Sequence, residues 1–150
     1  MFRQAIVAAL AVACAFLVRA QNDATRQPAA RRLFDAHCAS CHGADGKHTE
    51  GGPPPLEGSR WLSGPESRVI KIVLHGVRGD IEVDGKIYNL EMPGFGKVLS
   101  DGEVAAVVTF VRATWGAAPA PVTEDTVRRI RAATADRSDY WTAEELKKDP

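Results

Sequence analysis

Apolar residues recur at the spacing of a single helix face in three stretches of the chain, which predicts helices over residues 29–42, 64–75 and 101–115. The apolar stripes consist of Leu33 and Phe34, then Val69, Ile72 and Val73, then Val104, Val107, Val108 and Val111. Pro28 suits the first turn of the first helix, and Gly43 and Gly76 follow the last turns of the first two.

Two segments have the sequence of a capping box, in which a Ser and a Glu three residues later bond each other's backbone N–H. Ser63 and Glu66 predict the start of the middle helix in this way, and Ser100 and Glu103 predict the start of the third.

Between the helices the pattern changes. Residues 81–88 alternate apolar and polar around Asp84-Gly85, which predicts a β-hairpin. A turn-rich loop, residues 91–96, follows the hairpin. Residues 44–63 are rich in Gly and Pro, and so long a loop is unusual in a small domain unless a bound group holds it.

The residues after 116 predict a linker followed by short helices. Residues 117–121 form an Ala/Pro linker, residues 123–135 predict a basic helix, and residues 142–145 can cap one or two final turns. We therefore expect one domain over residues 27–116, followed by a linker and C-terminal helical extension over residues 117–150.

Residues 1–20 have the features of a cleaved secretory signal peptide. Arg3 precedes an apolar run of about fourteen residues, Ala5–Val18, and Val18-Arg19-Ala20 offers a cleavage site. The run is short for a membrane span, so an uncleaved anchor fits less well. Cys14 raises the alternative of a lipoprotein, but Ala11 stands where a leucine is usual. We expect a periplasmic protein with no membrane span after cleavage.

The charges of the chain exclude one class of partner. The 150 residues include 19 basic and 19 acidic side chains, and loss of Arg3 and Arg19 leaves 17 basic side chains. This balance argues against a nucleic-acid partner. The most basic local cluster, Arg128, Arg129 and Arg131, fits a solvated helix face or, less often, a docking site for an acidic protein.

Cys38-Ala-Ser-Cys41-His42 carries the clearest chemistry, because this spacing is the attachment motif of c-type haem. Two thiols one helical turn apart can form thioether bonds to one edge of a porphyrin, and the adjacent imidazole can bind the iron. A thioredoxin-type pair would need a βαβ context, and a zinc site would need a second pair of ligands. We therefore expect one covalently bound haem c, with no structural disulfide.

An iron bound by His42 needs a sixth ligand, and Met92 is the only methionine left once Met1 is removed with the signal. A thioether is a common second haem ligand in electron carriers. Among the other histidines, His37 is expected to be exposed, and His48 lies in a Gly-rich loop. His75 ends the middle helix, so it remains a less favoured alternative.

The chain resembles a class I monohaem cytochrome c over Gln27–Gly116. Beyond the haem motif, the resemblance is carried by residues 54–58, 92–96 and 108–112. It implies an all-α, cytochrome c-like bundle of helices around a covalently bound haem, with one short β-hairpin before the methionine loop. More narrowly, the chain is similar to small cytochromes that accompany periplasmic dehydrogenases or terminal oxidases.

The resemblance also implies roles for further residues. The carbonyl of Pro54 is expected to accept the Nδ1 proton of His42, and Phe110 is expected to pack toward the haem. Arg60 and Trp61 have the donors to bind a haem propionate. A surface Arg and a packing Trp are the equally weighted alternative.

With both axial positions filled, the iron has no open site for a substrate. The sequence therefore predicts a one-electron carrier rather than an enzyme, with dehydrogenase or oxidase partners, acting as a monomer or as a subunit of a complex. The alternative is a haem-based peroxidase or gas sensor in which Met92 is labile. A haem-free thiol-redox protein is a third class, which the haem motif disfavours.

Overall fold

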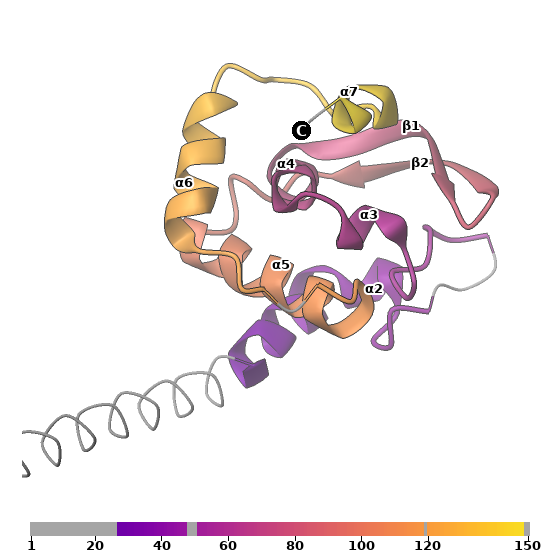
Figure 1. The fold of residues 1–150 in the computed structure, drawn as a ribbon, viewed down its shortest axis with the longest axis horizontal. Helices are drawn as coiled ribbons and strands as arrows, with labels where there is room; N and C mark the ends of the chain where they lie inside the picture. Colours follow the sequence, from indigo (N-terminus) through magenta and orange to yellow (C-terminus); the bar gives the residue numbers. More distant parts are fainter. Residues whose placement is uncertain (1–26, 48–50, 119, 149–150) are drawn as a thin grey trace, which may run out of the picture.

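The computed structural model describes residues 27–47, 51–118 and 120–148 (Figure 1). The predicted signal peptide and His48 lie outside the described residues. The chain is helical over residues 27–37 and then forms, in order, α2 Ala39–His42, α3 Arg60–Ser63, α4 Glu66–His75, β1 Gly76–Val83, β2 Lys86–Pro93, α5 Asp101–Trp115, α6 Glu124–Ala133 and α7 Ala143–Lys147. The described part is thus mainly helical, with one two-stranded antiparallel sheet.

The first predicted helix is divided at Cys38, so the expectation of one continuous helix over residues 29–42 was wrong. Cys38 has φ −123° and ψ −36°, outside helical geometry, although its N–H still donates to the Phe34 carbonyl at 2.8 Å. The short α2 then carries the rest of the haem motif and ends at Gly43, whose φ of 73° suits glycine.

Helix α4 ends at His75 as predicted, but it begins at Glu66 and not directly after Ser63, so the predicted capping box at its start was wrong. Ser63 belongs to α3, where its hydroxyl donates to the Arg60 carbonyl at 3.3 Å. Pro65 occupies the N-cap position of α4 and offers no side-chain cap. The two boxes at the other sites are confirmed, one at Ser100 of α5 and one at Thr142 of α7.

The hairpin is confirmed and is longer than its sequence pattern. Strands β1 and β2 pair from Gly76↔Pro93 to Val83↔Lys86. Asp84 and Gly85 both have positive φ, 52° and 74°, as a tight two-residue hairpin turn requires. The extra pairs place Met92 inside β2, so residues 91–93 are strand and not the loop that was expected.

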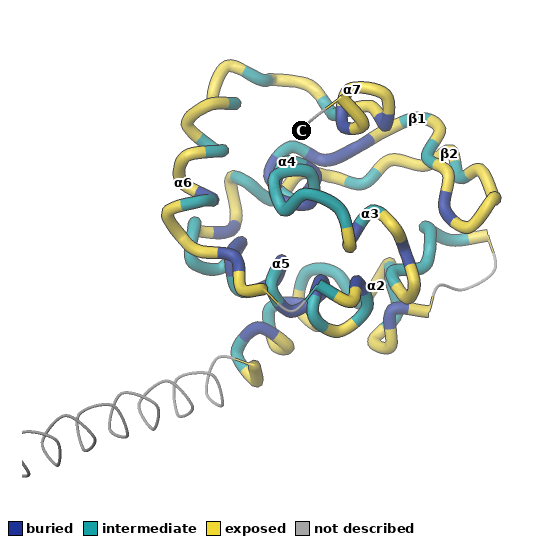
Figure 2. The backbone as a smooth tube through the Cα atoms, viewed as in Figure 1, coloured by how far each residue is buried: buried dark blue, intermediate teal, exposed yellow. Residues whose placement is uncertain are grey.

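The core lies where α5 crosses the N-terminal helix. Val104 and Val108 of α5 are fully buried, as is Phe34 (Figure 2). The Phe34 ring lies 5.7 Å from that of Phe110 and 5.0 Å from that of Trp115, a spacing at which aromatic rings attract beyond their buried area.

Residues after 116 pack on the same core. Val122 and Val127 are buried in the main cluster, and Leu146 of α7 is buried against Ile72 and Val77. Figure 1 shows α6 along one side of the molecule and α7 beside β1. In the described ranges, no helix is long and apolar enough to span a bilayer.

The basic cluster of α6 is bonded to this chain. Arg128 donates to Glu124 at 2.6 Å and to Asp125, and Arg131 forms an ion pair with Asp101 at 2.6 Å. Arg131 is half-buried, so the interpretation of all three arginines as one solvated face was wrong for this residue.

Candidate cofactor site

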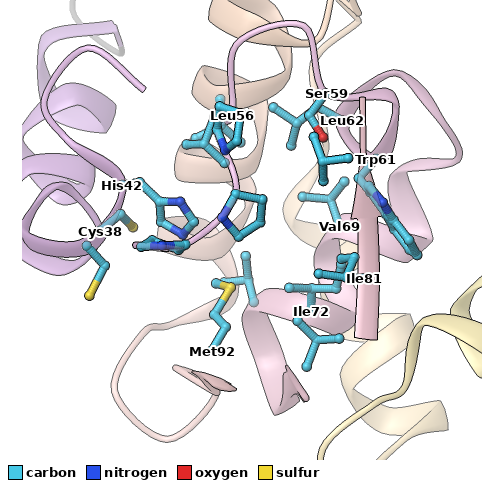
Figure 3. Close-up of a pocket in the computed structure, with 18 of the residues that line it drawn as sticks. Cys38, His42, Leu56, Ser59, Trp61, Leu62, Val69, Ile72, Ile81 and Met92 are labelled. Carbon is cyan, nitrogen blue, oxygen red and sulfur yellow. The ribbon is translucent and has the colours of Figure 1, made fainter. Parts of the chain in front are cut away.

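An apolar cavity lies between α2, the proline-rich loop, α4, α5 and one face of the hairpin (Figure 3). It is walled mainly by aliphatic side chains and prolines. The lining includes Pro53, Pro54, Pro55, Leu56, Leu62, Val69, Ile72, Val73, Val77, Ile81, Val83, Leu90, Val107 and Val111. An apolar cavity with a few convergent polar groups is the usual form of a cofactor site.

The two thiols of the haem motif lie at one edge of this cavity. Cys38 and Cys41 are both free, and Cys38 is half-buried whereas Cys41 is exposed. Burial, and to a lesser extent the neighbouring Cys41, raise the pKa of the Cys38 thiol to about 11. At neutral pH Cys38 is therefore a protonated thiol.

His42 presents its ring to the same cavity, and its buried Nδ1 has no hydrogen-bond partner within the described part of the chain. Burial lowers the pKa of His42, and the carbonyl of Pro54 partly offsets this effect. The Pro54 carbonyl thus acts on the ring, and the expected hydrogen bond from His42 Nδ1 to this carbonyl stays a prediction. The lowered pKa favours the neutral imidazole, the form that binds metals.

Met92 reaches the cavity from the hairpin. It is half-buried near the end of β2, and Figure 3 shows its sulfur directed into the space that His42 also faces. His37 and His75, the alternative ligands within the described ranges, are not among the lining residues. His37 lies against Phe95 and His75 bonds to Thr134.

Of the two residues predicted to bind a propionate, only Trp61 lines the cavity. Trp61 lines the cavity, but its indole N–H donates to the Glu82 carbonyl at 2.9 Å, so this donor is already used. Arg60 is exposed at the start of α3 and does not line the cavity. Trp61 therefore links α3 to the hairpin, a contact that the sequence pattern did not reveal.

Phe110 does not line the cavity itself but packs on Phe34, which does, so the expectation that it packs toward the cofactor stays a prediction. Its ring contacts Phe34 and Trp115, while Val107 and Val111 form the wall of α5. Sequence reasoning also missed the apolar hairpin residues of the lining, Ile81, Val83 and Leu90. The alternation of apolar and polar residues over 81–88 could have indicated them, because such a pattern is typical of a strand pair with one face buried.

These residues fit a covalently bound haem. Two free thiols lie at one edge of an apolar cavity, and a half-buried imidazole that favours its neutral form and a thioether both face its interior. These are the donor types that hold c-type haem.

Comparison with known proteins gives the same assignment. The family model described as cytochrome c matches residues 28–115. The chain is 37% identical over 106 residues to cytochrome c-552 of Thermus thermophilus, which covers 65% of this chain and 80% of that protein. It is 31% identical over 121 residues to the fructose dehydrogenase cytochrome subunit of Gluconobacter japonicus, covering 76% of this chain and 24% of that subunit.

The chain is also similar in sequence to an oxidase subunit. The cbb3-type cytochrome c oxidase subunit FixP of Azorhizobium caulinodans is 34% identical over 87 residues, covering 57% of this chain and 28% of that subunit. With the family model matching more than half of its length, the chain belongs to the cytochrome c family, which implies a covalently bound haem c.

Proposed function

We propose that this protein is a periplasmic monohaem c-type cytochrome that carries single electrons to or from a dehydrogenase or an oxidase. The observation that supports it best is the placement of His42 and Met92 on one apolar cavity, with the thiols of Cys38 and Cys41 at its edge.

Each of these four residues has a role in the proposal. Cys38 and Cys41 would hold the haem through thioether bonds, and His42 and Met92 would bind its iron. When bound, the haem supplies an iron that exchanges one electron between its ferric and ferrous states. With His42 and Met92 both bound to the iron, a substrate would have no place on the metal, which favours electron transfer over bond-making chemistry.

The walls of the cavity contribute to the potential. Aliphatic side chains of α4, α5 and the hairpin keep water from the site, and a low-dielectric surrounding disfavours the more highly charged ferric form. A thioether ligand acts in the same direction, so these residues favour a raised reduction potential.

Location and partners rest on two further observations. Residues 1–20 have the pattern of an export signal, and covalent haem attachment in bacteria takes place outside the plasma membrane. Several relatives are cytochrome subunits of dehydrogenases or oxidases. This supports redox proteins as partners.

Visible spectra of the purified protein, with and without carbon monoxide, test the proposal. A His/Met-ligated haem gives a far-red methionine band in the ferric state, and the ferrous state does not bind the gas. Gas binding by the ferrous protein would instead indicate a sensor or peroxidase with a labile sixth ligand. A colourless protein would contradict haem attachment.

A further inference from the structure

The segment that follows Met92, residues 94–99, is fixed to the end of α4. The N–H of Phe95 donates to the Val73 carbonyl at 2.7 Å, and that of Gly96 donates to the Leu74 carbonyl at 3.0 Å. A Cβ on Gly96 would lie 2.6 Å from the Leu74 carbonyl oxygen, so glycine permits this approach. The Phe95 carbonyl accepts from Val98 and Leu99 within the segment, whereas the carbonyls of Gly96 and Leu99 point to a partner outside it.

Arg131 of α6 binds those carbonyls. Its guanidinium donates to the Gly96 carbonyl and, at 2.9 Å, to the Leu99 carbonyl, while its Nε donates to Asp101 at 2.6 Å. The fixed fork of an arginine can satisfy several acceptors at once. The side chains of Arg131 and Asp101 are 30% and 20% exposed, so solvent competes only partly for these bonds. One residue of α6 thus holds the segment after Met92 at two points.

The strand that pairs with the Met92 strand is itself bonded to the chain after α6. Met92 pairs with Val77 of β1, and Val77 forms a bridge to Trp141. The Trp141 N–H donates to the Gly76 carbonyl at 3.1 Å, and its carbonyl accepts from Arg78 at 2.9 Å. Movement of Met92 away from the cavity therefore requires displacement of a hydrogen-bonded strand or of the segment that Arg131 binds.

We infer that Arg131 is a positioning residue for Met92, which keeps the thioether directed into the cavity and resists its replacement by other ligands. The inference rests on the proposed His42/Met92 ligation. Helix α6 lies beyond residues 28–115, the region that the family model matches, so this contact comes from outside the matched region. Because local opening of residues 94–99 must break the Arg131 bonds, their loss raises the population of the open form.

Imidazole binding to the ferric holoprotein tests the inference, since imidazole must displace the sixth ligand. We expect Arg131→Gln to bind imidazole about tenfold faster or more tightly than the wild type. The variant loses charge-assisted hydrogen bonds, and a loss of that size changes an equilibrium constant about tenfold. Arg129→Gln is the matched control, because Arg129 is an exposed arginine of the same helix that donates only to Thr126 among its described hydrogen bonds.

Hydrogen exchange on the same holoproteins gives a second readout. In Arg131→Gln the amides of Phe95 and Gly96 should exchange faster, while amides of the α5 core should not. Arg131→Lys keeps the charge and one donor group, so it should restore part of the wild-type resistance to imidazole. If Arg131→Gln is too unstable to purify, the graded effect of Arg131→Lys against Arg129→Lys decides the question.

The outcomes separate this inference from the proposed function. A wild-type protein that lacks the far-red methionine band contradicts the proposed ligation itself. A wild type with that band, together with an Arg131→Gln variant that binds imidazole no faster, overturns the role of Arg131. An equal effect of Arg129→Gln also overturns it, because a general change of charge on α6 would then explain the result.

Discussion

Met92 pairs with Val77 across the hairpin, so the proposed sulfur ligand belongs to a hydrogen-bonded strand and not to a free loop. The pairing orients successive side chains of β2 to opposite faces of the sheet. The face that carries Met92 is the face that closes the cavity.

Replacement of Met92 by Ala should abolish the far-red ferric band, allow carbon monoxide to bind the ferrous protein and lower the reduction potential by roughly 0.1 V or more. The physical reason is loss of the thioether that stabilises the ferrous form. Spectroscopy and potentiometry measure these changes. Leu90→Ala, a change on the same strand that also lines the cavity, should retain the band. A low-spin spectrum unaffected by Met92→Ala would contradict the assignment of this ligand.

Arg112 is a buried charge that links α5 to the α3–α4 junction. It is 7% exposed and donates to the carbonyls of Leu62 at 3.1 Å and Gly64 at 3.0 Å. Arg112→Met should lower the free energy of unfolding by about 2–4 kcal/mol, because these carbonyls lose a charged donor. Urea denaturation of the holoprotein measures the change.

The control for Arg112 is Arg32→Met, which alters an exposed arginine of the N-terminal helix. We expect it to change the free energy of unfolding by less than about 0.5 kcal/mol. Equal effects of the two substitutions would show that the buried contacts of Arg112 contribute nothing specific.

Gly94 should not tolerate a side chain. A Cβ at this position would lie 2.6 Å from the carbonyl carbon of His75 and 2.7 Å from the Leu74 oxygen, and both are backbone atoms that cannot rotate away. Gly94→Ala should therefore destabilise the protein by about 1–3 kcal/mol in thermal or urea unfolding.

Gly102 of α5, unlike Gly94, should accept a side chain. A Cβ there would have Glu124 Oε2 as its nearest neighbour, at 3.4 Å, and alanine is the better helix former. Gly102→Ala should raise the free energy of unfolding by up to about 1 kcal/mol. The same sign of change for both glycines would refute the steric argument.

The free energy of unfolding should depend on pH through the protonation of His75. Burial lowers its pKa below 6.5, with further lowering by Arg137 and Arg131. Its Nε2 lies 2.7 Å from the Thr134 hydroxyl, which donates to the Ile130 carbonyl and so accepts the proton of a neutral His75. The unfolded chain binds a proton more readily than the folded chain, so the stability due to His75 is full above about pH 6.5 and declines as the pH falls toward the folded pKa.

His75→Gln tests this dependence. The free energy of unfolding of the wild type minus that of His75→Gln should shrink as the pH is lowered, because the variant lacks this titration and the contribution of His42 cancels in the difference. Denaturation over about pH 5 to 8 covers the window of an ordinary or lowered histidine pKa. A difference that stays constant over that range would contradict the prediction.

Local signals in the sequence were sufficient for several elements. The Asp84-Gly85 turn, the Ser100 capping box and the end of α4 at His75 depend on residues within a few positions of one another. Such features are set by backbone sterics and short-range hydrogen bonds, which a sequence pattern records directly. The haem motif Cys38–His42 is local in the same sense.

Contacts between distant residues were decided only by the tertiary structure. The Trp61 indole binds the hairpin at Glu82, Phe110 turns toward Phe34, and Arg131 reaches the carbonyls of Gly96 and Leu99. The choice among such partners depends on how α5, α6 and the hairpin pack, because a side chain with several possible acceptors takes the one that packing brings within reach. The sequence by itself determined which chemical groups the chain has to offer. The packing of distant elements decided which of them face the cavity and which hold the others in place.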